Sequence, residues 1–443
     1  MTREMKDCGI KWIGEIPEEW ETKPIKYVLN NRGKKNNPIK TSNILSLSAK
    51  QGVVPVSERI GGGNKPKENV SLYDLAYPND IVLNNMNIIS GSVGISKYFG
   101  CISPVYYALF PKNKDDDPRF YNYIFQTKEF QRSLLGYGNG ILMKESSNGN
   151  FNTVRMRVSW ETLGNRMIAV PKVDEQQSIA NYLDHKTSQI DELVSNIEAQ
   201  IAKLDEYKKA LITQAVTKGL DPNAEMKDSG VKWIGDMPKE WHLVPAKHLI
   251  EIKKRIAGKE GYTVLSITQS GIKPKDITSG EGQLAESYAN YQFINPGEFG
   301  MNHMDLLTGW IDISNHFGVV SPDYRVFTTR HSQIDKRYLL YLYQMCYKNK
   351  IFYSLGQGAA LMGRWRLPAT NMMNMKLPVP PVDEQKNIAD FLDRQCDLID
   401  RSIGDLWTQL TQLGSYKKSL IFDYVTGKKE VPADFRKEQS YEK

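Results

Sequence analysis

Residues 5–20 read MKDCGIKWIGEIPEEW, and the motif returns at residues 226–241 as MKDSGVKWIGDMPKEW. Eleven of these 16 aligned positions are identical. A longer match aligns residues 170–217 with residues 379–426, where 21 of 48 positions are identical. A weaker match at an offset of 218 residues connects the segments between these anchors. Because an internal repeat determines the architecture before any local motif does, we interpret the chain as two copies of one unit.

The repeat divides the chain into five segments. We expect a first globular domain at residues 1–169, a central helix at 170–225, a second globular domain at 226–378, a C-terminal helix at 379–430 and a tail at 431–443. The length of 443 residues agrees with this division, because one hydrophobic core seldom holds so long a chain.

Leucine and isoleucine recur every seven residues in both long repeats. The positions are Leu183, Ile190, Ile197, Leu204 and Leu211 in the first copy and Leu392, Ile399, Leu406, Leu413 and Leu420 in the second. Such heptads predict two helices that pack together as a coiled coil. We expect Asp174 and Asp383 to be their N-caps, and the first helix to end near Thr217, before Gly219.

About 40 helical residues form a rod of roughly 60 Å, which is the length of a spacer. If the two rods pair antiparallel, the globular domains lie at opposite ends about a pseudo-two-fold axis. In the alternative arrangement each helix folds back on its own domain, and the heptad pattern is accidental.

The globular segments have the pattern of a mixed α/β fold of the α+β kind. Short β-branched or aromatic runs bounded by Gly, Pro or Asn predict strands at residues 43–48, 80–83, 262–268 and 324–328. Aromatic and aliphatic residues at helical spacing predict helices over residues 117–135 and 334–352, and we interpret those aromatics as core. The predicted fold is two mixed domains joined by two long helices that form an antiparallel coiled coil.

The positive charge lies in the two inner segments. Residues 25–160 contain 18 Lys and Arg against 9 Asp and Glu, and residues 242–378 contain 16 against 10. The net charge of the whole chain is +7, so the remaining segments together are acidic. Release of condensed counterions supplies much of the affinity of basic proteins for polyanions. The charge pattern therefore favours nucleic-acid binding, with an ordinary solvated surface as the alternative.

Motifs of catalysis and metal binding do not occur in the sequence. The Gly-rich run at 136–140 does not match G-x-G-x-x-G, and no phosphate-binding loop G-x-x-x-x-G-K-[ST] is present. The six histidines form no H-E-x-x-H motif, and the four cysteines show no C-x-x-C spacing. We interpret the three aspartates at 115–117 as a turn and a helix start. We expect no catalytic residue, no bound metal and no cofactor in this chain.

Export and membrane signals are also missing from the sequence. The N-terminal residues MTREMKDCG contain no apolar region, and no stretch approaches the roughly 18 apolar residues of a membrane span. We therefore expect a cytoplasmic protein.

The motif W-I-G-x-x-P-x-x-W at residues 12–20 and 233–241 precedes each domain, and P-x-V-D-E-Q-x-x-I-A-x-x-L-D opens each long helix. In this order, and over nearly the whole chain, the pattern resembles the specificity subunit of type I restriction-modification enzymes. The resemblance implies a non-catalytic bacterial or archaeal protein that recognises an asymmetric bipartite target in double-stranded DNA, one half with each domain. It also implies two methyltransferase subunits that hold S-adenosylmethionine, and restriction (translocase-nuclease) subunits that use ATP and Mg²⁺.

Other classes of protein account for less of the pattern. A methyltransferase that acts on a flipped base would carry a Pro-Pro-aromatic motif, whereas Pro380-Pro381-Val382 lacks the aromatic. A stand-alone bipartite DNA-binding protein, or a scaffold that binds an acidic partner, would use the same basic charge. The scaffold does not explain two divergent domains on a duplicated frame, and an asymmetric DNA target does.

Candidate DNA contacts are basic residues on loops that the two domains do not share, because readers of different bases should differ where they touch them. Arg suits guanine edges and Lys more often neutralises phosphate. The candidates are Lys34, Lys35, Lys65, Lys67, Lys144, Arg155 and Arg157 in the first domain and Lys253, Lys254, Arg255, Lys273, Lys275, Arg364 and Arg366 in the second.

We predict that the purified chain alone neither methylates nor cleaves DNA when S-adenosylmethionine, ATP and Mg²⁺ are supplied, because its sequence contains no catalytic motif. Transfer of tritiated methyl groups to plasmid DNA is the measurement. Methyl transfer by the isolated chain would contradict the prediction.

Overall fold

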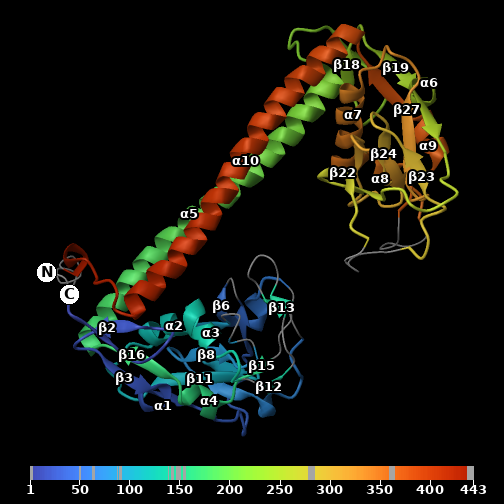
Figure 1. The fold of residues 1–443 in the computed structure, drawn as a ribbon. Helices are drawn as coiled ribbons and strands as arrows, with labels where there is room; N and C mark the ends of the chain where they lie inside the picture. The colour runs from blue at the N-terminus through green and yellow to red at the C-terminus, as the bar shows by residue number, and fades with distance from the viewer. Residues whose placement is uncertain are drawn as a thin grey trace. The chain divides into compact units, whose positions relative to one another are not determined.

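The computed structural model describes residues 3–48, 51–61, 65–86, 88, 92–137, 139–140, 144–145, 151–152, 156–277, 285–358 and 365–436. The chain divides into two compact units (Figure 1). Unit 1 comprises Met1–Ile197 and Thr408–Lys443, and unit 2 comprises Glu198–Trp407. In the described part of the chain, no helix combines the length and the apolar character needed to cross a membrane.

Each unit is built on a four-stranded antiparallel sheet with the same strand order. In unit 1 the order is β4 (Leu29–Asn31), β11 (Tyr106–Pro111), β8 (Ile81–Asn84) and β9 (Val93–Ile95). In unit 2 it is β20 (Ile250–Lys253), β27 (Arg325–Thr329), β24 (Phe299–Met301) and β25 (Ile311–Ile313). The strands expected at 80–83 and 324–328 are the central strands β8 and β27, each shifted by one residue.

Two-stranded antiparallel pairs surround the central sheets. In unit 1 these are β1 (Met5–Asp7) with β2 (Glu15–Pro17), β3 (Glu21–Pro24) with β16 (Met167–Val170), β5 (Leu45–Ser48) with β6 (Gly52–Pro55), β7 (Asp74–Ala76) with β10 (Gly100–Ile102), β12 (Asn139–Gly140) with β15 (Met156–Arg157), and β13 (Lys144–Glu145) with β14 (Phe151–Asn152). In unit 2 they are β17 (Met226–Asp228) with β18 (Asp236–Pro238), β19 (His242–Pro245) with β28 (Lys376–Val379), β21 (Leu265–Thr268) with β22 (Gly271–Pro274), and β23 (Gln292–Ile294) with β26 (Gly318–Val320).

Short helices complete each globular part. Unit 1 has α1 (Ile25–Val28), α2 (Pro118–Gln126), α3 (Lys128–Ser133) and α4 (Trp160–Gly164), and unit 2 has α6 (Ala246–Leu249), α7 (Lys336–Lys348), α8 (Ile351–Ser354) and α9 (Ala369–Asn374). The helix expected over 117–135 is interrupted, because Thr127 is extended and its hydroxyl caps α3. Asp117 caps α2, as the turn and helix start predicted at 115–117 require. The aromatic side chains of α2 and α7 are core, as expected, since Phe120 and Tyr343 are fully buried.

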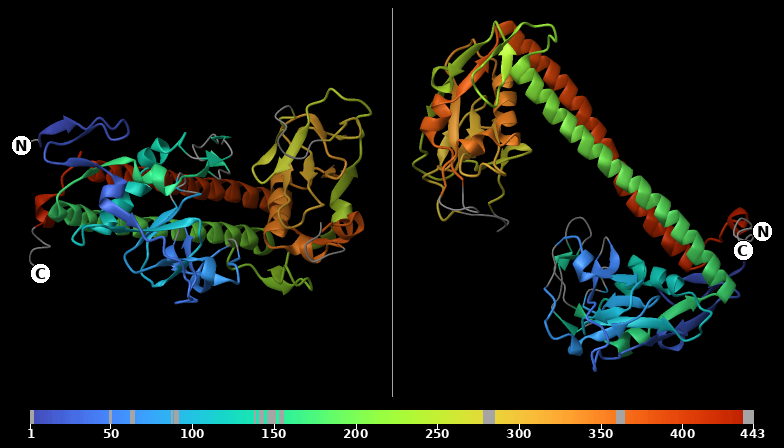
Figure 2. Two further views of the ribbon diagram at one scale, coloured as in Figure 1. Left: turned by 90° about the horizontal axis from the view of Figure 1, so that it is seen from below. Right: turned by 180° about the vertical axis from the view of Figure 1, so that it is seen from behind.

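Helices α5 (Val173–Lys218) and α10 (Val382–Val425) run antiparallel, and each passes from one unit into the other. Within unit 1 the start of α5 lies beside the end of α10, where Lys417 Nζ is 2.5 Å from Asp191 Oδ1 (Figures 1 and 2). Within unit 2 the end of α5 lies beside the start of α10, where Lys208 Nζ is 2.6 Å from Asp400 Oδ2. Each unit therefore contains one half of each long helix.

The prediction that Asp174 and Asp383 are the N-caps of the long helices is wrong. Both helices begin one residue before Asp174 and Asp383, so these aspartates lie in the first helical turn. Their negative charge still favours the helix, because a helix N-terminus carries partial positive charge. Helix α5 ends at Lys218, and Gly219 follows with a left-handed φ of 77°.

The heptad residues lie on the sheltered face of the two helices. Leu183 and Leu392, close to the globular parts, are fully buried. Also buried are Ile190, Ile197, Ile399 and Leu420, and half-buried are Leu204, Leu211, Leu406 and Leu413. A heptad seam between only two helices leaves its side chains partly accessible wherever no third element covers it.

The sequence motifs shared by the two copies join each globular part to its long helix. In unit 1 the indole Nε1 of Trp20 donates to Glu175 Oε2 at 2.9 Å, and in unit 2 Trp241 donates to Glu384 Oε2 at 3.0 Å. Both indole rings are fully buried. The motif tryptophan of each domain is thus bonded to the motif glutamate that begins each helix.

The motif glutamine makes a second junction. The Gln176 side chain accepts from the backbone N–H of Asp117 at 3.2 Å and donates to the Pro171 carbonyl at 3.1 Å. In unit 2 Gln385 makes the matching bonds to Asp335 and Pro380 at 2.9 Å each. Each fully buried glutamine therefore connects the start of a long helix to the start of α2 or α7.

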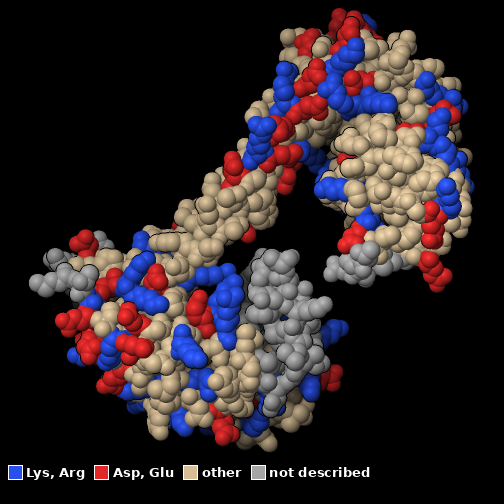
Figure 3. All heavy atoms as spheres, in the orientation of Figure 1, with Lys and Arg blue, Asp and Glu red and all other residues tan. Residues whose placement is uncertain are grey.

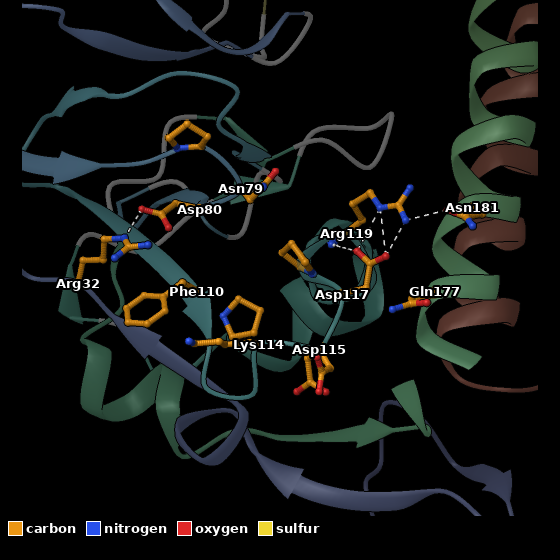
Figure 4. A pocket seen from close by; sticks show the side chains of 14 residues that line it. Arg32, Asn79, Asp80, Phe110, Lys114, Asp115, Asp117, Arg119, Gln177 and Asn181 are labelled. Carbon is orange, nitrogen blue, oxygen red and sulfur yellow. Dashed lines mark hydrogen bonds and ion pairs between the residues drawn. The ribbon is translucent and has the colours of Figure 1, made fainter. Parts of the chain in front are cut away.

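In each unit an arginine guanidinium adds charged hydrogen bonds to this junction, and we call it the arginine fork. In unit 1 the Arg119 guanidinium lies 2.6 Å from Asp117 Oδ2 and donates at 2.7 Å to Asn181 of α5 (Figure 4). It also donates at 2.7 Å to Asp184 of α5. In unit 2 Arg337 occupies the same place and bonds to Asp390 and Asp393 of α10. The fork holds the first turns of each long helix against the cap of the neighbouring domain helix.

We predict that Trp241→Phe weakens the junction in unit 2 more than Trp20→Phe does in unit 1. In the described part of the chain, Glu384 has the Trp241 donor and no ion pair, so its carboxylate loses about 1–3 kcal/mol of stabilisation. Glu175 keeps Arg3, whose Nη1 lies 2.7 Å from Glu175 Oε1. Hydrogen exchange of the first turns of α5 and α10 in the two variants measures the difference, and equal deprotection would contradict it.

Candidate nucleic-acid interface

Charge density alone does not locate an interface. On the visible face of each unit, Lys and Arg side chains are interspersed with Asp and Glu side chains (Figure 3). The useful distinction is whether a basic side chain already has a carboxylate partner within its own unit. A carboxylate partner occupies some of the N–H donors of a basic side chain and offsets its charge, so a paired side chain contributes less to phosphate binding.

Three of the candidate contacts are paired. Lys35 Nζ is 2.9 Å from Asp74 Oδ1, Lys253 Nζ is 2.8 Å from Glu251 Oε2, and Arg255 forms an ion pair with Glu298. The Arg255 pair has a counterpart in unit 1, where Arg32 lies 2.5 Å from Asp80. Glu298 and Asp80 also accept matching backbone bonds, from Asn295 and Tyr77. Arg255 thus belongs to a scaffold contact that both units contain.

Other candidates are exposed or lie outside the described part. The side chains of Lys34, Lys65, Lys67, Lys254 and Lys273 are exposed, and that of Lys275 is half-buried. The backbone of Lys144 lies in β13, and its side chain falls outside the described residues, as do Arg155 and Arg364. The exposed lysines are therefore the candidates whose positions suit phosphate contact.

Arg157 and Arg366 occupy equivalent positions. Arg157 pairs with Asn139 in the β12–β15 ladder, and Arg366 pairs with Gln357 in an isolated bridge. Both arginines are exposed, and both end an Arg-x-Arg run at an offset of 209 residues. The sequence interpretation that Arg157 and Arg366 are unshared is therefore wrong, because the 218-residue offset used for the inner segments does not align them.

A buried polar residue lies beside each of these arginines, and the sequence analysis missed both. The backbone N–H of Val158, next to Arg157, donates to the Asn85 carbonyl at 3.0 Å, and the N–H of Leu367 donates to the His303 carbonyl at 2.9 Å. Asn85 is fully buried and His303 is 6% exposed. Among the described residues, the Asn85 amide atoms and His303 Nδ1 are buried and lack a partner within hydrogen-bond geometry.

A second residue completes each group. In unit 1 the Tyr107 hydroxyl donates to the Val158 carbonyl at 2.9 Å, and in unit 2 Arg325 Nη2 donates to the Leu367 carbonyl at 3.1 Å. We call Asn85, Tyr107 and Arg157 the unit 1 triad, and His303, Arg325 and Arg366 the unit 2 triad. Their first two members correspond at an offset of 218 residues, so the fold builds one site twice and fills it with different side chains.

The two triads differ in charge. Burial raises the pKa of Tyr107, and the neighbouring Asn85 and Arg157 oppose that rise. Burial lowers the pKa of Arg325 to about 10, and repulsion from Arg366 adds to the effect. Burial also lowers the pKa of His303 to about 3, and both arginines contribute. The unit 2 triad at neutral pH therefore consists of a neutral imidazole and two guanidinium ions.

A pocket in unit 1 adjoins the Arg119 junction. It has a volume of about 450 Å³, and its lining includes Arg32, Asp80, Asp117 and Arg119 (Figure 4). Four of its charged side chains form the ion pairs Arg32–Asp80 and Arg119–Asp117. Across the described ranges, no group of three or more His, Cys, Asp or Glu side chains is arranged to hold a metal ion.

We predict that unit 2 loses stability as the pH falls below about 6.5 and that His303→Asn, the unit 1 residue, reduces this loss. A histidine whose folded pKa is about 3 instead of 6.5 takes up its proton mainly after unfolding. The contribution of the neutral His303 to the free energy of unfolding is therefore complete above pH 6.5. Below that pH it declines by up to about 1.4 kcal/mol per pH unit. Urea unfolding at pH 7 and pH 4.5 measures the change. The exposed His316→Asn is the control, and a loss as large in His303→Asn as in the parent would contradict the prediction.

Comparisons with known proteins agree with the duplicated architecture. The family model described as type I restriction modification DNA specificity domain matches residues 17–203 and again residues 238–403. Two relatives in Methanocaldococcus jannaschii are the type I restriction enzyme MjaVIII specificity subunit, 26% identical over 94% of both chains, and the putative MjaX specificity subunit, 24% identical over 95% of this chain and 96% of the relative.

A solved structure shows the same fold. It comes from a study of complex assembly and conformational transition in a type I R-M system, with a TM-score of 0.66, 11% identity, and coverage of 93% of this chain and 99% of that one. The two family matches together span well over half of the present sequence. This chain therefore belongs to the type I restriction-modification DNA specificity family and is a non-catalytic specificity subunit.

Proposed function

We propose that this subunit recognises an asymmetric, two-part DNA sequence, with the globular part of unit 1 contacting one half and that of unit 2 the other. The observation that carries the proposal is the pair of triads. One backbone site is built twice, with Asn85 and Tyr107 in unit 1 and His303 and Arg325 in unit 2. Two identical readers would suit a palindrome, whereas two readers that differ suit an asymmetric target.

The partners follow from the family. We propose that two methyltransferase subunits dock on this chain, one against each copy of the repeat, and that they hold the S-adenosylmethionine. Restriction subunits would bring ATP and Mg²⁺. Two docking places are supported by the repeat, because the same buried junction is built in both units, at Trp20–Glu175 and at Trp241–Glu384.

The test is a map of modified bases in the native genome. Long-read sequencing of strains with and without the gene should show methylated adenines in one two-part motif with a fixed spacer, and these should vanish on deletion. Replacing residues 242–378 with the corresponding segment of another specificity subunit should change one half of that motif only. A palindromic motif, or a change in both halves, would overturn the proposal.

A further inference from the structure

The unit 2 triad contains two guanidinium groups that have no ion-pair partner among the described residues. Arg325 is 6% exposed, and its guanidinium bonds to the Leu367 carbonyl and contacts Met372 Sδ at 3.3 Å. In the part of the chain that the structure describes, no carboxylate forms an ion pair with Arg325 or Arg366. A buried cation without a counter-charge is costly, and a second guanidinium beside it adds repulsion. Such an arrangement is stabilised when an anion binds.

The outer arginine is the one that an external anion can reach. Arg366 is exposed, whereas Arg325, the first residue of β27, is buried and donates to the carbonyl of Leu367, the residue after Arg366. Arg157 has the same exposed place in unit 1, although the residues beneath it differ. A residue that reads a particular base should differ between two readers of different half-sites. A residue that contacts the phosphate backbone need not differ, because every sequence presents the same phosphates.

We propose that Arg157 and Arg366 are matched phosphodiester contacts to the DNA backbone, and that Arg325 is a positioning residue that directs Arg366 outward by repulsion. The inference rests on the proposed function, since it takes DNA as the ligand. It assigns to both arginines a contact with the phosphate backbone and no contact that reads a base. In unit 1 the neutral Tyr107 replaces Arg325, so Arg157 binds its phosphate without a second cation behind it.

The first test uses the full chain and Arg366→Ala. Binding is measured by fluorescence anisotropy from 0.05 to 0.3 M NaCl, on a 30-bp duplex with the mapped motif and on one with its second half scrambled. Loss of one phosphate contact should reduce the slope of log K against log salt by about 0.9, which is roughly a tenfold loss at 0.1 M. Both duplexes should lose affinity equally. Arg366→Lys should keep the slope, because an ammonium also neutralises phosphate.

The second test isolates the role of Arg325. Arg325→Tyr with His303→Asn installs the unit 1 residues, and Tyr107 shows that a tyrosine at this place can donate to the backbone carbonyl. Affinity should fall about threefold when Arg366 is present. In the Arg366→Ala background the same exchange should have no effect, because there is no guanidinium left to position. Thermal unfolding of each variant reports whether the fold is retained.

The outcomes separate the inference from the proposed function. If the parent chain shows no salt-dependent binding to either duplex, the proposed function itself fails. If the parent binds and Arg366→Ala leaves the salt slope unchanged, or weakens only the duplex with the intact second half, the phosphate assignment is overturned. An equal effect of the Arg325 exchange in both backgrounds would show that Arg325 stabilises the fold and does not position Arg366.

Discussion

The hydrogen bond between a buried indole and the first turn of a long helix is the contact on which both units depend. Trp20 and Trp241 each have a donor that must be satisfied inside the core, and Glu175 and Glu384 accept from it. The bond fixes where each helix begins and in which direction it leaves. The hydrogen bonds of Gln176 and Gln385 then set the rotation of each long helix about its own axis. The repeated motifs therefore build the junction, and none of the predicted DNA contacts lies within them.

The end of the opposite helix completes each core. In unit 1 the end of α10 contributes Leu420, Ile421 and Tyr424 to the core that contains Trp20. In unit 2 the end of α5 contributes Ala215 and Val216 to the core that contains Trp241. Neither globular part thus closes its core with its own outgoing helix alone. This mutual dependence explains why the repeat includes the far ends of the helices, where both copies keep a Val-Thr pair.

Local, periodic features were predictable from the sequence, and contacts between distant segments were not. Heptads, the core aromatics of α2 and α7, and the short strands follow from spacing along a few residues. The break at Thr127 and the early helix starts depend on single backbone conformations that spacing does not encode. Each triad unites residues that are far apart in the sequence. Asn85 follows β8, Tyr107 lies in β11 and Arg157 in β15. In unit 2 the matching residues follow β24, lie in β27 and lie in an isolated bridge. A signal existed, since the offsets of 218 and 209 align Asn85 with His303 and Arg157 with Arg366.

The triads also explain how a duplicated frame can hold two different readers. A change at Tyr107 or Arg325 alters the charge behind an exposed arginine, yet both side chains satisfy the same backbone carbonyl. The bond to the Val158 or Leu367 carbonyl is therefore preserved while the charge of the site changes. Divergence at such positions costs the fold little, because the shared hydrogen bond is kept. Selection for a new half-site can then proceed in one copy while the junction at Trp20 and Trp241 stays the same.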